Sequence, residues 1–183
     1  MTNNWILTGE PGIGKTTVIQ RTVSQLRGDG ITVAGIIAPE RRSEGGRTGF
    51  DIASLDGSIV RQMASRDWTE EPKIGAYGVD VQAIDTVTES VLPPARRHAD
   101  VVVIDEIGPM QTRSDRFVAE VRETIAATVP TLVSIKQAGL SDRLRMVGAN
   151  EFTPIEVTED NREELPDQLT AEMIRHLETS VRG

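Results

Sequence analysis

Three glycines, a lysine and two threonines stand close together near the amino end of the chain, in the stretch GEPGIGKTT of residues 9–17. The stretch fits the pattern G-x-x-x-x-G-K-[ST], a loop whose backbone N–H groups turn inward around an anion. We expect the loop to bind nucleotide phosphates, with the catalytic Lys15 placing its charge on the outer phosphates and Thr16 offering its hydroxyl to Mg²⁺. The predicted nucleotide-binding residues are Gly9, Glu10, Pro11, Gly12, Ile13, Gly14, Lys15, Thr16 and Thr17.

A second group of candidate residues follows an apolar run, in the sequence DVVVIDEIGPM of residues 100–110. Four β-branched residues predict a buried strand that ends in Asp105 and Glu106, and in an open parallel sheet ligands lie beyond the carboxyl ends of the strands. Asp105 is therefore predicted to hold Mg²⁺, directly or through a water, and Glu106 to orient or deprotonate a water. Taken alone, such a strand end is often simply solvated, but beside a phosphate loop it becomes a candidate site. The predicted nucleotide-binding residues here are Val102, Val103, Ile104, Asp105, Glu106, Ile107 and Gly108.

Three arginines, Arg41, Arg42 and Arg47, lie in a glycine-rich segment between these motifs. We single out Arg47 as a candidate catalytic residue, because the flanking glycines give it the mobility to reach the terminal phosphate as an arginine finger. The alternative is a solvated basic turn. Phe50 and Tyr77 are candidates to pack against a base, or core residues.

The remaining basic groups suggest no site. His98 and His176 are far apart in the sequence and are expected at the surface, so they do not predict a metal centre. Arg96 and Arg97 are expected to form a solvated helix end.

Strand patterns alternate with helix patterns along the chain, which favours an α/β fold. Strands are expected over residues 4–8, 31–38, 49–55, 73–79, 101–104, 131–135 and 152–158. Helices are expected over residues 15–27 and 162–177, from a cap at Ser114 to about residue 128, and from a cap at Asp80 to Pro93–Pro94, which kink or end that helix. The predicted architecture over residues 1–183 is one P-loop NTPase domain. It has a mostly parallel central sheet, helices on both faces and a small β-hairpin excursion around Gly45–Gly46.

The composition of the chain excludes several kinds of site and several classes of protein. The chain has 183 residues, no cysteine and a net charge of −8, so disulfides and thiolate metal sites are excluded and nucleic-acid binding is unlikely. No apolar run approaches the roughly 20 residues of a membrane span, and the first residues lack a signal-peptide pattern. We therefore expect a cytoplasmic protein, with a monomer favoured. Only three of the 20 basic residues are lysines, which fits either a high-salt source or a GC-rich genome.

With both motifs identified, the chain resembles the THEP1 family of P-loop nucleoside triphosphatases over nearly its whole length. The segments similar to the family are the phosphate loop, ERRSEGGRTGFDIASLDG of residues 40–57, IGAYGVD of residues 74–80, VVVIDEIGPM of residues 101–110 and VTEDNREELPDQL of residues 157–169. The chain departs from the family at Gln111–Thr112 and over residues 134–142, where many members carry a histidine. The resemblance implies Mg²⁺-dependent hydrolysis of the terminal phosphate of ATP, GTP, CTP and UTP with low base selectivity.

Two other functions use the same motifs. A P-loop kinase would transfer the γ-phosphate to a small nucleotide or metabolite, although Glu106 directly after Asp105 favours water as the acceptor. A non-catalytic nucleotide switch is the second alternative, but the N-K-x-D base reader typical of guanine-specific switches is not present in the sequence. Fold alone does not choose among the three functions.

Overall fold

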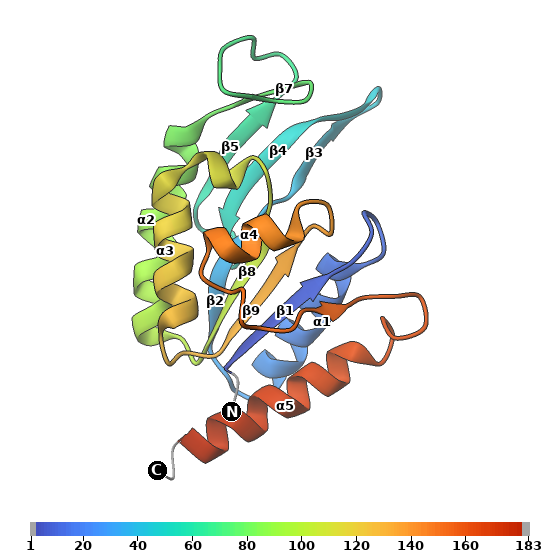
Figure 1. The fold of residues 1–183 in the computed structure, drawn as a ribbon, viewed down its shortest axis with the longest axis vertical. Helices are drawn as coiled ribbons and strands as arrows, with labels where there is room; N and C mark the ends of the chain where they lie inside the picture. Colours follow the sequence, from blue (N-terminus) through green and yellow to red (C-terminus); the bar gives the residue numbers. More distant parts are fainter. Residues whose placement is uncertain (1–2, 181–183) are drawn as a thin grey trace.

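A computed structural model describes residues 3–180 of the chain, and one ten-stranded sheet runs through it (Figure 1). Half of the sheet is parallel, in the order β10-β1-β9-β8-β2. Its strands are β10 (Ile155–Glu156), β1 (Asn4–Thr8), β9 (Thr131–Ile135), β8 (Val101–Ile107) and β2 (Val33–Ile37). Because these strands are parallel, their carboxyl ends meet at one edge of the sheet.

The expected hairpin excursion is larger than one hairpin and continues the same sheet with antiparallel strands. The order runs on through β4 (Gly46–Ser54), β5 (Val60–Ser65), β7 (Tyr77–Val79) and β6 (Lys73–Ile74), and β3 (Glu40–Ser43) pairs with β4. The strand expected over residues 73–79 is divided by a turn at Gly75, whose φ of 58° favours glycine. In Figure 1 this part rises beyond the carboxyl ends of the parallel strands.

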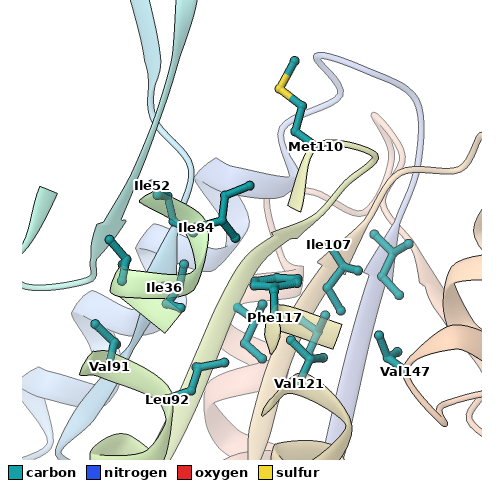
Figure 2. Packing of buried hydrophobic residues seen from close by; sticks show 14 of the residues in the cluster. Ile36, Ile52, Ile84, Val91, Leu92, Ile107, Met110, Phe117, Val121 and Val147 are labelled. Carbon is teal, nitrogen blue, oxygen red and sulfur yellow. The ribbon is translucent and has the colours of Figure 1, made fainter. Parts of the chain in front are cut away.

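Helices cover both faces of the sheet, as the strand–helix alternation predicts (Figure 1). One face carries α1 (Lys15–Gly28) and α5 (Leu165–Ser180); the other carries α2 (Val81–His98), α3 (Asp115–Ala126) and α4 (Leu140–Met146). A short 3-10 helix, η1 (Gln111–Arg113), precedes α3. Side chains along β8 alternate between the faces: Val101 and Val103 pack with α1, while Val102 and Ile104 pack with α2 and α3. Figure 2 shows Phe117 of α3 among the buried hydrophobic residues that pack between the sheet and helices α2, α3 and α4.

The predicted helix caps are present. Asp80 accepts a hydrogen bond from the backbone N–H of Ala83 at 3.0 Å, and Ser114 accepts one from that of Phe117 at 2.8 Å. Each hydroxyl or carboxylate satisfies one of the backbone donors that a helix start leaves unpaired. The two caps fix where α2 and α3 begin.

Several expected element boundaries are wrong, including the end of β8, which runs to Ile107 rather than stopping at residue 104. Helix α2 does not end at Pro93–Pro94 but runs on to His98, because Val91, Leu92 and Ala95 remain buried on its inner face. The last strand is only the two residues of β10, and the last helix begins at Leu165 rather than at residue 162. No helix among residues 3–180 is both long and apolar enough to span a membrane.

Arg96 is not a solvated helix end. Its Nη1 donates to Glu120 Oε2 at 3.1 Å and to Thr124 Oγ1 at 3.2 Å, and its Nη2 donates to Glu123 Oε2 at 2.8 Å. The side chains of Arg96 and Glu120 are only 18% and 11% exposed. The guanidinium therefore joins α2 to α3 and compensates a nearly buried carboxylate.

Replacing Arg96 with alanine is expected to lower the free energy of unfolding by about 2–3 kcal/mol, because it leaves the Glu120 carboxylate buried without its partner. Urea unfolding followed by circular dichroism measures the change. The matched control is Arg97→Ala at the neighbouring exposed position, which should change stability by less than about 0.5 kcal/mol. Equal effects of the two substitutions would contradict a structural role of the Arg96 network.

Candidate active site

The phosphate loop connects the end of β1 to the start of α1. Gly14, the N-cap residue of α1, takes a left-handed conformation with a φ of 113°. No side chain forms a capping hydrogen bond at this end of the helix. The backbone N–H groups of the first turn and the positive end of the helix dipole therefore point toward the loop, as anion binding requires. Gly9 is needed for a second reason, since a Cβ there would lie 2.8 Å from the carbonyl oxygen of Val157.

The Lys15 side chain lies over this loop. Its ammonium donates to the carbonyl oxygens of Gly9 at 2.8 Å and Glu10 at 3.0 Å. Burial lowers the pKa of Lys15, while the carboxylates of Glu106 and Asp105 oppose that shift. The structure thus brings Lys15 into the electrostatic range of both acids of the second motif.

Asp105 lies at the carboxyl end of β8, directly opposite Ser134 of β9 in the sheet register. It is 5% exposed, and its Oδ1 accepts a hydrogen bond from Ser134 Oγ at 2.5 Å. The Thr16 hydroxyl is close enough to this carboxylate to lower its pKa. Burial raises the pKa of Asp105, and the two hydroxyl donors oppose the rise. The two predicted metal ligands, Thr16 and Asp105, are therefore neighbours.

Glu106 occupies an irregularity in the sheet. Asp105 pairs with Ser134 and Ile107 with Ile135, so Glu106 is an extra residue in β8 relative to β9. Such bulges re-aim a side chain and are common beside active sites. Ile104 and Ile107, three residues apart, both pack in the cluster under α2 and α3. The bulge gives Glu106 an orientation that regular alternation would not.

The Glu106 carboxylate lies in a confined position between β8 and β9. Its Oε1 is 3.5 Å from the Nζ of Lys136, and a Cβ at Gly108 would lie 3.5 Å from the same oxygen. The contact with Lys136 is an ion pair without hydrogen-bond geometry, and this buried oxygen accepts no hydrogen bond from the described residues. Burial raises the pKa of Glu106, and the Lys136 ammonium opposes the rise. A buried acceptor oxygen of this kind is ready to take a hydrogen bond from a bound hydroxyl or water.

Arg47 reaches the same region from the antiparallel part of the sheet. Its Nε donates to the Tyr77 hydroxyl at 3.1 Å and its Nη1 to Glu40 Oε1 at 2.8 Å, and its guanidinium lies 5.1 Å from the centroid of the Phe50 ring. Tyr77 and Phe50 pack edge to face. A cavity of about 180 Å³ lies between this group and Glu106, with Lys136 also in its wall.

A second cavity, of about 220 Å³, lies against the phosphate loop itself and shares no wall residue with the first. Gly12, Gly14 and Thr17 line it together with Arg162 from the segment after β10. The Nη1 of Arg162 donates to the carbonyl oxygen of Ile13 at 3.2 Å. This contact ties the carboxyl-terminal part of the chain to the phosphate loop.

The structure brings Lys15 of the phosphate loop near Asp105 and Glu106, and Arg47 shares a cavity with Glu106. Val102, Val103, Ile104 and Ile107 lie elsewhere: their side chains are fully buried in the two core clusters, where they position Asp105 and Glu106. Arg41 and Arg42 pair with Asp51 and Glu40 instead. Sequence reasoning missed Ser134, Lys136, Gln111 and Arg162.

A signal for two of the missed residues was available. Residues 131–135 were expected to form a strand, and polar residues at its carboxyl end follow the same rule that identified Asp105. That rule places Ser134 and Lys136 beside the acids. For Arg162, which comes from a loop, we find no comparable local signal.

Comparisons with known proteins identify the family of the chain. The model of the NTPase family matches residues 4–170. Nucleoside-triphosphatase THEP1 of Methanopyrus kandleri is 37% identical over 182 residues, covering 97% of this chain and 99% of that protein, and that of Pyrococcus abyssi is 32% identical, covering 92% and 91%. Among solved structures, THEP1 from Aquifex aeolicus superposes with a TM-score of 0.81 at 29% identity, covering 93% of this chain and 98% of that chain. The solution structure of a human cancer-related nucleoside triphosphatase gives a TM-score of 0.71 at 32% identity, covering 92% and 96%.

Proposed function

The chain belongs to the NTPase family together with the THEP1 nucleoside triphosphatases, and on that premise we propose that it hydrolyses the terminal phosphate of nucleoside triphosphates. One observation carries the proposal. The phosphate loop follows β1, and Asp105 and Glu106 lie on β8, so all three stand at the carboxyl edge of the parallel strands, on either side of β9. An anion cradle, a site for a cation and a candidate base are the parts that phosphoryl transfer to water needs.

Each residue has a distinct part in the proposed reaction. The loop amides and Lys15 hold the phosphates and offset their negative charge. Glu106 orients a water in line with the terminal phosphorus and accepts its proton, so that a bond forms from the water oxygen to phosphorus as the bond to the diphosphate breaks. The nucleoside diphosphate leaves with the electron pair of the broken bond. Because Glu106 Oε1 is a buried acceptor without a hydrogen-bond donor among the described residues, it can take this role without first breaking a hydrogen bond.

The donor set fits Mg²⁺. Thr16 and Asp105 supply neighbouring oxygen atoms, which this cation prefers. No three His, Cys, Asp or Glu side chains gather into a metal site within residues 3–180, so the ion would take its remaining ligands from phosphates and waters. Bound there, it would neutralise charge on the phosphates.

Arg47 is proposed to assist at the terminal phosphate. It lines the cavity that Glu106 also lines, so both side chains border the same space. Its hydrogen bonds to Tyr77 and Glu40 hold the guanidinium in place, and an arginine so placed stabilises charge in the transition state. This differs from the freely mobile arginine that the flanking glycines suggested.

Phosphate release from ATP, GTP, CTP and UTP, each with Mg²⁺ and with excess chelator, tests the proposed function. We expect release from all four with kcat/KM values that differ by less than ~100-fold, since a pocket built to hydrogen-bond one base would discriminate by more than that. Chelation should abolish activity, and added Mg²⁺ should restore it. A wild-type protein that releases no phosphate from any of the four would refute the proposal, and full activity in chelator would refute the metal site.

A further inference from the structure

The 180 Å³ cavity beside Glu106 is larger than hydrolysis requires. A water molecule takes a share of about 30 Å³ in the liquid, and an engineered cavity of about 150 Å³ in another protein holds benzene. The cavity here is about 180 Å³. It therefore offers room for a molecule the size of one ring next to the carboxylate that we assign to the water.

Most of its wall is chemically unsuited to water or phosphate. Phe50, Met63, Ile74, Tyr77 and Met110 line it with apolar surface, which gains free energy by covering carbon rather than water. Four of these five residues come from the antiparallel strands. The strands added to the parallel sheet thus build the apolar wall of this cavity.

The polar side chains of the wall include more cations than carboxylates, and Glu40, which lies outside the wall, pairs with Arg47. Arg47 and Lys136 contribute two cations, Glu106 contributes one carboxylate and Gln111 contributes an amide. The distribution fits a compact ligand with an apolar body and an anionic group. A hydroxyl of the same ligand would find its acceptor in Glu106 Oε1, which is buried and accepts no hydrogen bond from the described residues.

We propose that this cavity binds a second substrate, a small anionic alcohol about one ring in size, which accepts the terminal phosphoryl group in place of water. The inference rests on the proposed function, because it uses the same phosphate loop and the same Glu106. The acceptor oxygen forms a bond to the γ-phosphorus, and the bond from that phosphorus to the bridging oxygen breaks. Glu106 takes the hydroxyl proton and the nucleoside diphosphate leaves with the electron pair. A nucleoside triphosphate and an alcohol thus give a nucleoside diphosphate and a phosphate monoester.

The test uses 4-(hydroxymethyl)benzoate as the anionic alcohol and 4-methylbenzyl alcohol as its uncharged analogue. The full chain is incubated with ATP and Mg²⁺, with and without each alcohol, and phosphate and phosphate monoester are both measured by ³¹P NMR. We expect monoester from the anionic alcohol, less phosphate released as its concentration rises, and at least tenfold less monoester from the uncharged analogue.

Two substitutions that fill the cavity connect the result to this place in the fold. Ile74 and Ala38 line the cavity, are half-buried and have no part in the proposed hydrolysis. Ile74→Trp, or Ala38→Leu if the first variant does not fold, should lower monoester formation at least tenfold and leave phosphate release without alcohol within threefold of the wild type. The matched control is Val60→Trp at an exposed position on β5 outside the cavity, which should change neither.

The outcomes separate the two proposals. A protein that releases no phosphate without alcohol refutes the proposed function. A protein that hydrolyses ATP but forms no monoester from either alcohol, with phosphate release unaffected by both, refutes the acceptor site alone. Monoester formed equally by the wild type and by the folded cavity-filling variants would also refute it, because the acceptor would then bind elsewhere.

Discussion

Replacing Lys15 with alanine is expected to lower kcat/KM for ATP by about 10³–10⁵-fold, the largest effect of any single substitution in the chain. Losing a charged hydrogen-bond partner of the phosphates should weaken binding by about 10–100-fold. Losing an electrostatic stabiliser of the transition state should lower kcat by a further ~10²–10³-fold. Isothermal titration with ATP and a phosphate-release assay measure the two parts separately.

The Lys15 substitution also removes two hydrogen bonds to the carbonyl oxygens of Gly9 and Glu10, so thermal unfolding should be followed in parallel. Lys73→Ala is the matched control, because Lys73 is an exposed lysine on β6 and lies outside both cavities. It should retain wild-type affinity and turnover. Wild-type values for Lys15→Ala in both assays would remove the assignment of residues 9–17 as a phosphate-binding loop.

Replacing Glu106 with glutamine is expected to separate chemistry from binding. The amide keeps the size of the side chain but cannot accept a proton, so kcat should fall by ~10²–10⁴-fold, the usual worth of a general base. Affinity for ATP with Mg²⁺ should stay within a few-fold of the wild type, because Lys15, Thr16 and Asp105 are unchanged. Single-turnover kinetics together with a binding titration give both quantities.

Asp105→Asn provides the comparison for Glu106→Gln. Asp105 is the proposed metal ligand and accepts a hydrogen bond from Ser134, so its replacement should weaken binding as well as turnover. If Glu106→Gln hydrolyses ATP at the wild-type rate, the proposed proton transfer is wrong, whether the acceptor is water or an alcohol. The control variant Glu178→Gln changes an exposed carboxylate on α5 outside both cavities and should leave kcat unchanged.

The parts of the molecule that depend on local sequence were predictable. The phosphate loop, the strand that ends in Asp105 and the caps at Asp80 and Ser114 are each determined within a few residues. The parallel direction of the central strands follows from the alternation of strand and helix patterns. These features place Lys15, Thr16, Asp105 and Glu106 at one edge of the sheet.

Features that depend on distant neighbours were not predictable in the same way. The bulge at Glu106 exists only in the pairing of β8 with β9, so no pattern within residues 101–107 reveals it. The pairing of Glu106 with Lys136 joins residues 30 positions apart. The extent of the antiparallel strands was underestimated because β3 is exposed at every position and β6 has two residues, so neither shows the alternation by which strands are recognised.

Strand β4 joins the parallel part of the sheet to the antiparallel part, so its pairing limits where residues can be inserted during divergence. On one side its carboxyl-terminal residues pair with β2 and its amino-terminal residues pair with β3. Residues added at the tip near Gly45 would lengthen a turn without moving any paired residue. One residue added between Ile52 and Ala53, with the pairing to β2 kept, would instead turn Phe50 away from the cavity and Ile52 out of the core, because successive side chains point to opposite faces. Relatives are therefore free to vary the length of this tip, while the register of β4 constrains the cavity wall and the core together.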